Sequence, residues 1–336
     1  MSIPKTHWVT IVDQVSESPD SIQYREVEAP QISGPNDIII KNKYAGVNFI
    51  ETYFRKGQYD AQFPFIFGRE ASGVVAAVGA NVKDFRVGDK VFYLSPRTQA
   101  QYTKIVYDGQ YHAIHKLPED ATEDELKLYG AILVQGLTAI TFAHEARKVE
   151  KGQFVVVWAA AGGTGQAFTQ YVSSLGGRVI AIASSEEKLE IAKSLGAEFL
   201  INSSKDDVEK KVHTFTDGHG ADAVFDGVGA DAFDASLNSL ARKGSLVSFG
   251  KSSGFSKPFS IRRLQPKNLK VLSPTLFGYI ATKEEWDRYI KILLEQVKSN
   301  RLKFALHTYQ LKDYPQAASD LENRKTTGKL VLEIPQ

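Results

Sequence analysis

The chain has 336 residues, which suggests about two domains, and its 41 Lys and Arg residues nearly balance its 39 Asp and Glu residues. The net charge of +2 gives no excess for binding a polyanion, and a composition of 43% hydrophobic and 24% charged residues excludes wholesale disorder. The absence of cysteine excludes disulfides, thiolate nucleophiles and cysteine-ligated zinc.

The N-terminal residues carry no apolar leader typical of secretion. No stretch approaches the roughly 18 uninterrupted apolar residues that a membrane-spanning helix needs. We therefore expect no membrane association and a location in the cytoplasm. The nucleus is the alternative location.

Residues 1 to about 125 are expected to be rich in β-structure. Short apolar runs, separated by Gly, Pro, Asn and Asp, lie at 8–12, 38–40, 73–79 and 91–94. The turn signal Val87-Gly88-Asp89-Lys90 directly precedes the last of them. This pattern predicts a small, partly open β-barrel.

From about residue 130 strands and helices alternate. Apolar strand patterns at 154–160, 178–183, 199–201, 221–225 and 246–249 are separated by helical patterns at 166–175, 186–195 and 205–215. Such alternation predicts an α/β fold with a doubly wound parallel sheet. A helix at 284–298 and a strand at 329–334 follow, and that strand is expected to return to the first domain. The expected domains are 1–130 with 275–336, and 131–274.

A glycine-rich turn lies between the first of these strands and its helix. Counted back from Gly165, Ala160-Ala161-Gly162-Gly163-Thr164-Gly165 reads A-x-G-x-x-G. Gly162 would let the backbone approach a pyrophosphate, Gly165 would allow close packing of helix on strand, and the helix N-terminus would supply N–H groups. A plain tight turn is the alternative, but the flanking strands favour a dinucleotide.

The end of the second strand indicates which dinucleotide. An NAD site usually has an acidic residue there for the ribose 2′-hydroxyl, whereas this chain has Ser184, Ser185 and, one turn later, Lys188. Hydroxyl groups and a cation suit the 2′-phosphate of NADPH, although Glu186 follows directly. Ser184 could also simply cap the next helix.

Several motifs together resemble a known superfamily. They are N-x-x-E-x-Y-x-R-x-G-x-Y at 48–59, Gly68-Arg69-Glu70, A-A-x-G-G-x-G at 159–165, Asp226-Gly227-Val228-Gly229, Ser248-Phe249-Gly250 and the segment 324–329. Over essentially its whole length the chain resembles the medium-chain dehydrogenases/reductases, and within them the zeta-crystallin type of NADPH:quinone oxidoreductase, above all the fungal members. The resemblance implies a GroES-like barrel as catalytic domain, a Rossmann domain that binds NADPH, and a homodimer.

The resemblance also indicates that the catalytic zinc is missing. Zinc-dependent relatives have G-H-E where this chain has Gly68-Arg69-Glu70, and a guanidinium has no lone pair for a metal. The closest histidine pair, His112 and His115, has i, i+3 spacing in an expected loop or strand, so no metal site is expected. A scaffold without a Lewis acid suits acceptors that take hydride readily, such as quinones and conjugated enones.

The matched motifs imply roles for individual residues. Asn48, Tyr53 and Tyr59 would lie at the nicotinamide and substrate end, where they could polarise an acceptor oxygen; the alternative is that both tyrosines only pack. The further cofactor residues implied by the resemblance are Gln135, Thr138, Asn202, Phe249, Gly250, Lys251, Phe277 and Arg324. Gln135 and Thr138 could instead serve only helix packing. Asn202 could simply form a turn, and Arg324 could be a solvated surface cation.

These observations predict an NADPH-dependent, zinc-independent quinone reductase. Within enzymology the alternative is an NADPH-dependent reductase of enone or alkenal double bonds. A different class of function, binding of AU-rich RNA or a structural crystallin-type role, is associated with the same family. The balanced charge argues against RNA, and the glycine turn argues against a purely structural protein.

Overall fold

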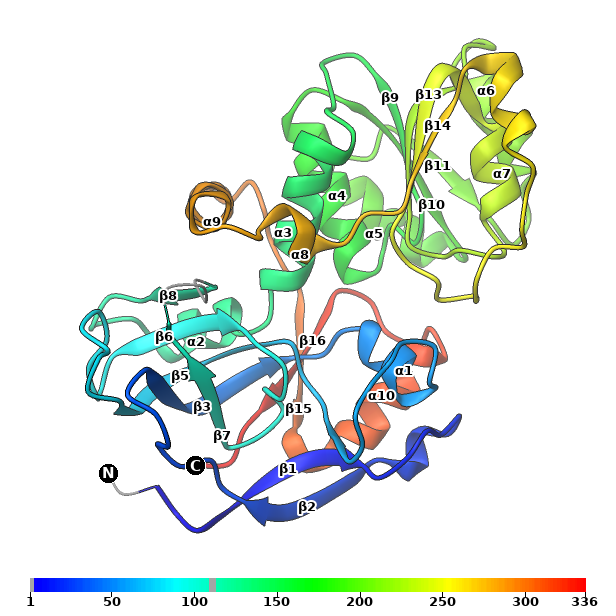
Figure 1. The fold of residues 1–336 in the computed structure, drawn as a ribbon. Coiled ribbons are helices and arrows are strands. Elements are labelled where there is room, and N and C mark those ends of the chain that lie inside the picture. Colours follow the sequence, from blue (N-terminus) through cyan, green and yellow to red (C-terminus); the bar gives the residue numbers. More distant parts are fainter. Residues whose placement is uncertain (1–2, 109–112) are drawn as a thin grey trace. The chain divides into compact units, whose positions relative to one another are not determined.

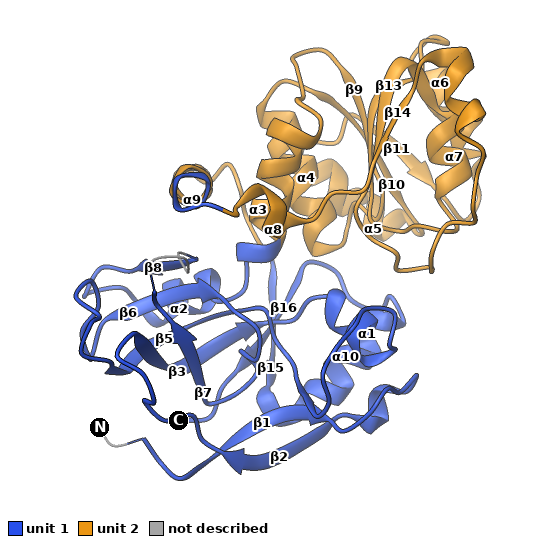
Figure 2. Cartoon of the chain, viewed as in Figure 1, with its two compact units in different colours: residues 1–134, 282–286, 305–336 blue, residues 135–281, 287–304 orange. Residues whose placement is uncertain are grey.

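The computed structural model describes residues 3–108 and 113–336, which form two compact units (Figure 2). Unit 1 consists of Met1–Val134, Thr282–Trp286 and Ala305–Gln336, and unit 2 of Gln135–Ala281 and Asp287–Phe304. Each unit has its own sheet and its own hydrophobic core.

Unit 1 is built mainly from antiparallel strands (Figure 1). Its larger sheet has the order β15-β16-β3-β5-β6-β8, with β7 also paired to β3, and comprises β3 (Asp37–Gly46), β5 (Glu70–Val78), β6 (Lys90–Leu94), β7 (Tyr102–Val106), β8 (Ile114–Lys116), β15 (Leu306–Gln310) and β16 (Lys329–Glu333). A smaller sheet joins β2 (Gln23–Glu28), β1 (Thr6–Val12) and β4 (Phe65–Ile66). The late strand β16 pairs antiparallel with β3, Val331 opposite Gly46, so a C-terminal strand completes the N-terminal sheet.

Three α-helices of unit 1 interrupt the β-rich pattern. They are α1 (Ile50–Arg55), α2 (Glu123–Tyr129) and α10 (Tyr314–Glu322). Helix α2 begins with a capping box, in which Thr122 accepts from the N–H of Glu125 and the Glu125 side chain accepts from the N–H of Thr122. Helix α1 contains the central part of the 48–59 motif.

Unit 2 contains the predicted doubly wound sheet. Its six strands are parallel, in the order β11-β10-β9-β12-β13-β14: β9 (Phe154–Val157), β10 (Arg178–Ala183), β11 (Phe199–Asn202), β12 (Ala221–Asp226), β13 (Leu240–Ser248) and β14 (Lys270–Leu272). Its helices are α4 (Gly163–Ser174), α5 (Glu186–Ser194), α6 (Val208–Phe215), α7 (Phe233–Asn238) and α8 (Leu276–Tyr279), together with most of α3 (Leu133–Thr141) and of α9 (Lys283–Lys298). Figure 1 shows α3 and α4 on one face of the sheet and α6 and α7 on the other. The predicted fold class is confirmed.

The unit boundaries differ from the expected domains near the C-terminus. Residues 275–281 and 287–304, expected with the catalytic domain, cluster with unit 2. The reason is local packing: Tyr289 of α9 donates a hydrogen bond to Glu145, and Gln170 of α4 exchanges two hydrogen bonds with the backbone of Lys303, each of 2.9 Å.

Within the described part of the chain, no single helix has the length and apolar character to cross a membrane. One bent pair, Glu123–Tyr129 with Leu133–Ala146, reaches that length and composition only when its two members are taken together across a 53° bend.

Candidate active site

The glycine turn follows β9 and leads directly into α4. Ala159 has a left-handed backbone with φ of 50°, and its carbonyl accepts from the N–H of Gly162 at 2.9 Å. Gly162 is the N-cap of α4, with φ of −74° and ψ of 162°. The first N–H groups of α4 have no acceptor inside the helix, so this N-terminus can bind an anion.

The three glycines of the turn meet different surroundings. A Cβ on Gly165 would lie 2.2 Å from the carbonyl oxygen of Ala159, and one on Gly163 would lie 2.1 Å from Oε1 of Gln135. A Cβ on Gly162 would meet only the Ala159 oxygen, at 3.3 Å. Gly163 and Gly165 therefore allow contacts within the protein, whereas the space beside Gly162 is left for a ligand. The turn fits a dinucleotide pyrophosphate.

Of the two predicted cofactor residues on α3, Gln135 lies beside this turn. Gln135 contacts Gly163 through its Oε1, which is buried and has no hydrogen-bond partner among the described residues. Thr138 follows one turn later and is 8% exposed. Ala161 is buried, and its carbonyl accepts from Nε2 of Gln166 at 2.8 Å. Most buried acceptors in folded proteins have a hydrogen-bond partner. Gln135 Oε1 is therefore a candidate to accept a hydrogen bond from a bound ligand.

The segment after β10 holds Ser184, Ser185 and Lys188. Ser185, and not Ser184, is the N-cap of α5: its hydroxyl accepts from the N–H of Lys188 at 3.4 Å, while Ser184 is exposed. The alternative that Ser184 caps the helix is therefore wrong, because the capping residue is the next one, Ser185. An extended backbone at Ser185, with φ of −151°, makes it the last non-helical residue.

Glu186, the carboxylate that weakened the NADPH prediction, is engaged elsewhere. Its Oε1 accepts from Nδ2 of Asn202 at 2.7 Å and lies 3.3 Å from Nζ of Lys205. These two partners lower the pKa of Glu186. Asn202 is buried and also accepts from the N–H of Ser204, so much of its side chain serves the protein itself.

The segment after β13 carries Phe249, Gly250 and Lys251. The N–H of Phe249 donates to the carbonyl of Asp226 at 2.9 Å, which holds the segment against the end of β12. Because β9, β12 and β13 are parallel neighbours, their carboxyl ends bring this segment to the same sheet edge as the glycine turn. Lys251 lies over the ring of Phe255, 4.4 Å from its centroid, and Phe277 on α8 is 47% exposed.

Asp226 is a residue of this edge that sequence reasoning did not single out. Its Oδ1 accepts from the N–H groups of Val228 and Gly229 at 2.7 and 3.1 Å, while Oδ2 is buried without a partner among the described residues. Burial raises the pKa of Asp226 to about 6, against the effect of those two donors. The D-G-V-G motif was its sequence signal.

In unit 1 the predicted Asn48 belongs to a buried ionic network. Nζ of Lys329 donates to Glu70 at 2.7 Å, to Oδ1 of Asn48 at 2.8 Å and to the carbonyl of Val47 at 2.7 Å. Nδ2 of Asn48 donates to the same Glu70 oxygen at 2.8 Å. The Lys329 and Glu70 side chains have no exposed surface. Asn48 is thereby fixed at the start of α1, a structural duty that its sequence motif did not reveal.

Glu51 on α1 is a second buried carboxyl. Its Oε2 accepts from the N–H of Asn48 at 3.0 Å, and Oε1 is buried without a partner among the described residues. Burial raises its pKa to about 7; the Asn48 N–H and the charges of Arg69 and Lys329 only partly oppose this shift. Glu51, Glu70 and Lys329 lie inside the quoted motifs but were assigned no role from sequence.

The two predicted tyrosines pack against each other. Their rings meet edge-on with centroids 5.3 Å apart, and Phe49 lies 5.4 Å from Tyr53. Tyr53 is 6% exposed and Tyr59 is half-buried. Packing is thus part of the role of both residues, and their action on an acceptor stays a prediction.

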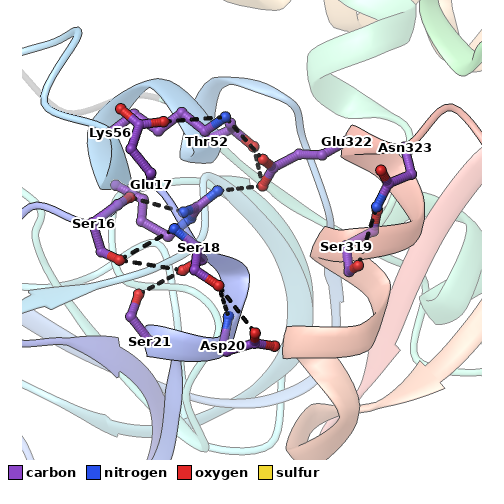
Figure 3. A network of polar contacts seen from close by, with 11 residues as sticks. Ser16, Glu17, Ser18, Asp20, Ser21, Thr52, Lys56, Ser319, Glu322 and Asn323 are labelled. Atoms are coloured by element: carbon purple, nitrogen blue, oxygen red, sulfur yellow. Dashed lines mark hydrogen bonds and ion pairs between the residues drawn. The ribbon is translucent and has the colours of Figure 1, made fainter.

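Helix α1 is held to the C-terminal α10 by one carboxylate. Glu322 of α10 pairs with the buried Arg55, accepts from the hydroxyl of Thr52 at 3.3 Å and lies 3.2 Å from Nζ of Lys56 (Figure 3). Arg324, a predicted cofactor residue, follows two positions later with a left-handed φ of 58° and is exposed.

Metal ligands do not gather in the described residues: no group of three or more His, Cys, Asp or Glu side chains could hold a metal ion there. His112 lies outside the described residues. Arg69, at the position of the zinc-binding histidine, lies over the ring of Phe54 with its Cζ 4.3 Å from the centroid.

Known proteins resemble this chain along nearly its whole length. Residues 34–184 match the alcohol dehydrogenase GroES-like domain, and residues 163–295 match the zinc-binding dehydrogenase domain. A probable quinone oxidoreductase of Schizosaccharomyces pombe is 42% identical over 311 residues, which cover 92% of this chain and 91% of that protein. This chain is a member of the quinone oxidoreductase family.

Two further proteins resemble the chain over nearly its whole length. Quinone oxidoreductase of Escherichia coli, solved as a complex with NADPH, has a TM-score of 0.91 and 30% identity, and covers 97% of this chain and 99% of that one. A 2-haloacrylate reductase of a Burkholderia species is 33% identical and covers 95% of this chain and 96% of that protein. The chain therefore shares its medium-chain dehydrogenase/reductase fold with the Escherichia coli protein, as the sequence motifs predict.

Proposed function

We propose that this chain reduces quinones with NADPH and without zinc. The observation that carries the proposal is the glycine turn, where the space beside Gly162 is open while the neighbouring Gly163 and Gly165 are closely packed. The NADPH complex of the Escherichia coli relative and the name of the Schizosaccharomyces pombe relative support the same cofactor and acceptor.

NADPH, when bound, supplies a hydride. Ala161, Gly162, Gly163, Thr164 and Gly165 would hold its pyrophosphate through the N-terminus of α4. Ser184, Ser185 and Lys188 would hold the 2′-phosphate, because Glu186 is turned to Asn202 and Lys205. The remaining proposed contacts are Gln135, Thr138, Asn202, Phe249, Gly250, Lys251, Phe277 and Arg324.

Unit 1 would supply the acceptor end. Tyr53 and Tyr59 would contact the acceptor and polarise its oxygen by hydrogen bonding. Asn48 serves them indirectly: with Lys329 and Glu70 it fixes the start of α1, from which both tyrosines are positioned. We assign the catalytic role to unit 1 and the cofactor role to unit 2, and we propose a homodimer in the cytoplasm.

Arg69 and the lack of cysteine support chemistry without zinc, since neither a guanidinium nor an absent thiolate can ligate a metal. Without a metal, alkoxide formation from an alcohol lacks its usual Lewis acid, while a conjugated acceptor takes hydride directly. Reduction of conjugated double bonds is the second candidate, favoured by the relative described as a 2-haloacrylate reductase.

Steady-state oxidation of NADPH against ortho-quinones, para-quinones and enones tests the proposal. Quinone turnover that survives a chelator is the expected result. Turnover with enones alone would favour the second candidate, and no turnover with any acceptor, or loss of turnover on chelation, would overturn the proposal.

A further inference from the structure

The guanidinium of Arg69 interacts with the charge of Glu51 but has no direct acceptor in the described part of the chain. Its side chain makes no hydrogen bond or ion pair with any described residue, and its Nε is buried. Its one close contact is the ring of Phe54, 4.3 Å from Cζ. Arg69 is half-buried, and a buried donor such as its Nε without an acceptor is costly. Arginine presents its donors in a rigid fork suited to oxygen ligands.

The backbone on both sides of Arg69 is fixed. Gly68 has a left-handed φ of 107°, and a Cβ there would lie 2.3 Å from Oγ1 of Thr98 and 2.4 Å from the N–H nitrogen of Gln99. Glu70, on the other side, is locked to Lys329 in the interior. The backbone position of Arg69 is therefore fixed, so its side chain starts from a preorganised point, as binding or catalysis by a charged group requires.

Arg69 also belongs to the same aromatic cluster as the predicted acceptor residues. Phe54, on which it lies, contacts Tyr59 with centroids 5.6 Å apart, and Tyr59 contacts Tyr53 at 5.3 Å. The guanidinium and the two tyrosines are thus joined through adjacent ring contacts.

The buried charges of unit 1 balance Arg69 only in part. Glu70 and Lys329 neutralise each other directly, at 2.7 Å. Arg55 is paired with Glu322. Glu51 is the remaining carboxyl, and its raised pKa of about 7 leaves much of it uncharged at neutral pH. An anionic oxygen from outside the chain would complete the charge balance.

We propose that Arg69 binds the acceptor oxygen and stabilises the negative charge that develops on it during reduction. When hydride adds to a quinone or conjugated ketone, NADPH becomes NADP⁺ and the acceptor gains both electrons. The electron pair of its carbonyl π bond moves onto oxygen. That oxyanion lies against the guanidinium until it takes a proton from water, which gives the neutral product. Arg69 thus takes over the charge stabilisation that a metal would otherwise provide. The inference rests on the proposed function and extends it to acceptors with a conjugated carbonyl.

Binding of 4-nitrophenol tests the site independently of turnover, because its phenolate mimics the reduced oxygen and is coloured. The proteins to compare are the wild type, Arg69→Gln, Arg69→Lys and Arg86→Gln, with and without NADP⁺. Arg86→Gln removes the same charge from a side chain that is 79% exposed. The neutral probe is 4-nitroanisole, and the absorbance of the bound phenol is titrated against pH.

The wild type and Arg86→Gln should bind the phenolate more tightly than nitroanisole and lower the pKa of the bound phenol. Arg69→Gln should lose this preference, Arg69→Lys should keep part of it, and NADPH affinity should be unchanged in all four. The kcat/KM for quinones should fall about tenfold to hundredfold in Arg69→Gln.

Equal phenolate binding in wild type and Arg69→Gln, or equal kcat/KM, would overturn the inference. Phenolate binding that depends on Arg69 in an enzyme that reduces no acceptor would instead overturn the proposed function and leave the anion site standing.

Discussion

Replacing Lys329 with Met would leave a carboxylate unpaired in the interior of unit 1. Nζ of Lys329 makes three hydrogen bonds of 2.7 to 2.8 Å, and neither Lys329 nor Glu70 has exposed side-chain surface. Removing one partner of a buried ion pair costs about 3–5 kcal/mol, chiefly because the remaining charge cannot be solvated. We expect a loss in that range in the free energy of unfolding.

Urea unfolding at neutral pH measures this loss, and two variants control it. Lys329→Met with Glu70→Gln removes both charges and should recover part of the loss. Lys43→Met breaks an ion pair with Glu123 whose side chains are 29% and 60% exposed, and it should cost at most about 1 kcal/mol. A loss below about 1 kcal/mol in Lys329→Met would refute the reasoning. So would a double variant whose loss equals the summed losses of Lys329→Met and Glu70→Gln measured separately.

Three further predictions concern Glu51, Lys188 and Tyr53. Folded Glu51 keeps its proton to about pH 7 while the unfolded carboxyl releases it near 4.5, so stability should fall as pH rises through that window, by up to about 3 kcal/mol. In Glu51→Gln the free energy of unfolding, measured with urea, should depend less on pH in this window than in the wild type. Parallel pH profiles for the two proteins would contradict the prediction. The wild type should bind NADPH at least about tenfold more tightly than NADH, a difference of about 1.4 kcal/mol in binding free energy. Calorimetry should show a smaller difference between the two cofactors in Lys188→Glu. Equal affinities of the wild type for NADPH and NADH would argue against the 2′-phosphate site. Tyr53→Phe should slow quinone turnover by about 1–2 kcal/mol in activation free energy, and complete loss would point to an obligatory acid.

The doubly wound sheet and its glycine turn could be predicted because their signals are local. The apolar strand β9, the glycines and the next strand follow one another within 30 residues, and the parallel-sheet rule then places their ends at one edge. Strand β14 was missed because it is a three-residue edge strand that begins with Lys270.

The ionic network of unit 1 could not be predicted in the same way. Glu70 and Lys329 lie 259 positions apart, and nothing in either local sequence indicates that β5 and β16 bring them together. Arg69 was interpreted only as the loss of a metal ligand, because its missing partner is a property of the folded surroundings. The packing of α9 against unit 2 likewise depends on contacts such as Tyr289 with Glu145, which no periodicity encodes.

The glycine turn also supplies a pair of variants that separate cofactor binding from folding. In Gly165→Ala the new Cβ would lie 2.2 Å from the Ala159 oxygen, a backbone atom that cannot move aside, so the domain itself should be destabilised. In Gly162→Val the new Cβ meets only that oxygen at 3.3 Å, and φ of −74° with ψ of 162° suits a β-branched residue.

Calorimetric titration of Gly162→Val with NADPH, beside a thermal unfolding curve, tests the central claim most directly. The wild type should bind NADPH. The variant should stay folded, with a melting temperature much closer to wild type than that of Gly165→Ala, but show no measurable NADPH binding and no quinone turnover. Wild-type NADPH affinity in a folded Gly162→Val protein would show that the turn is not the cofactor site and would contradict the account.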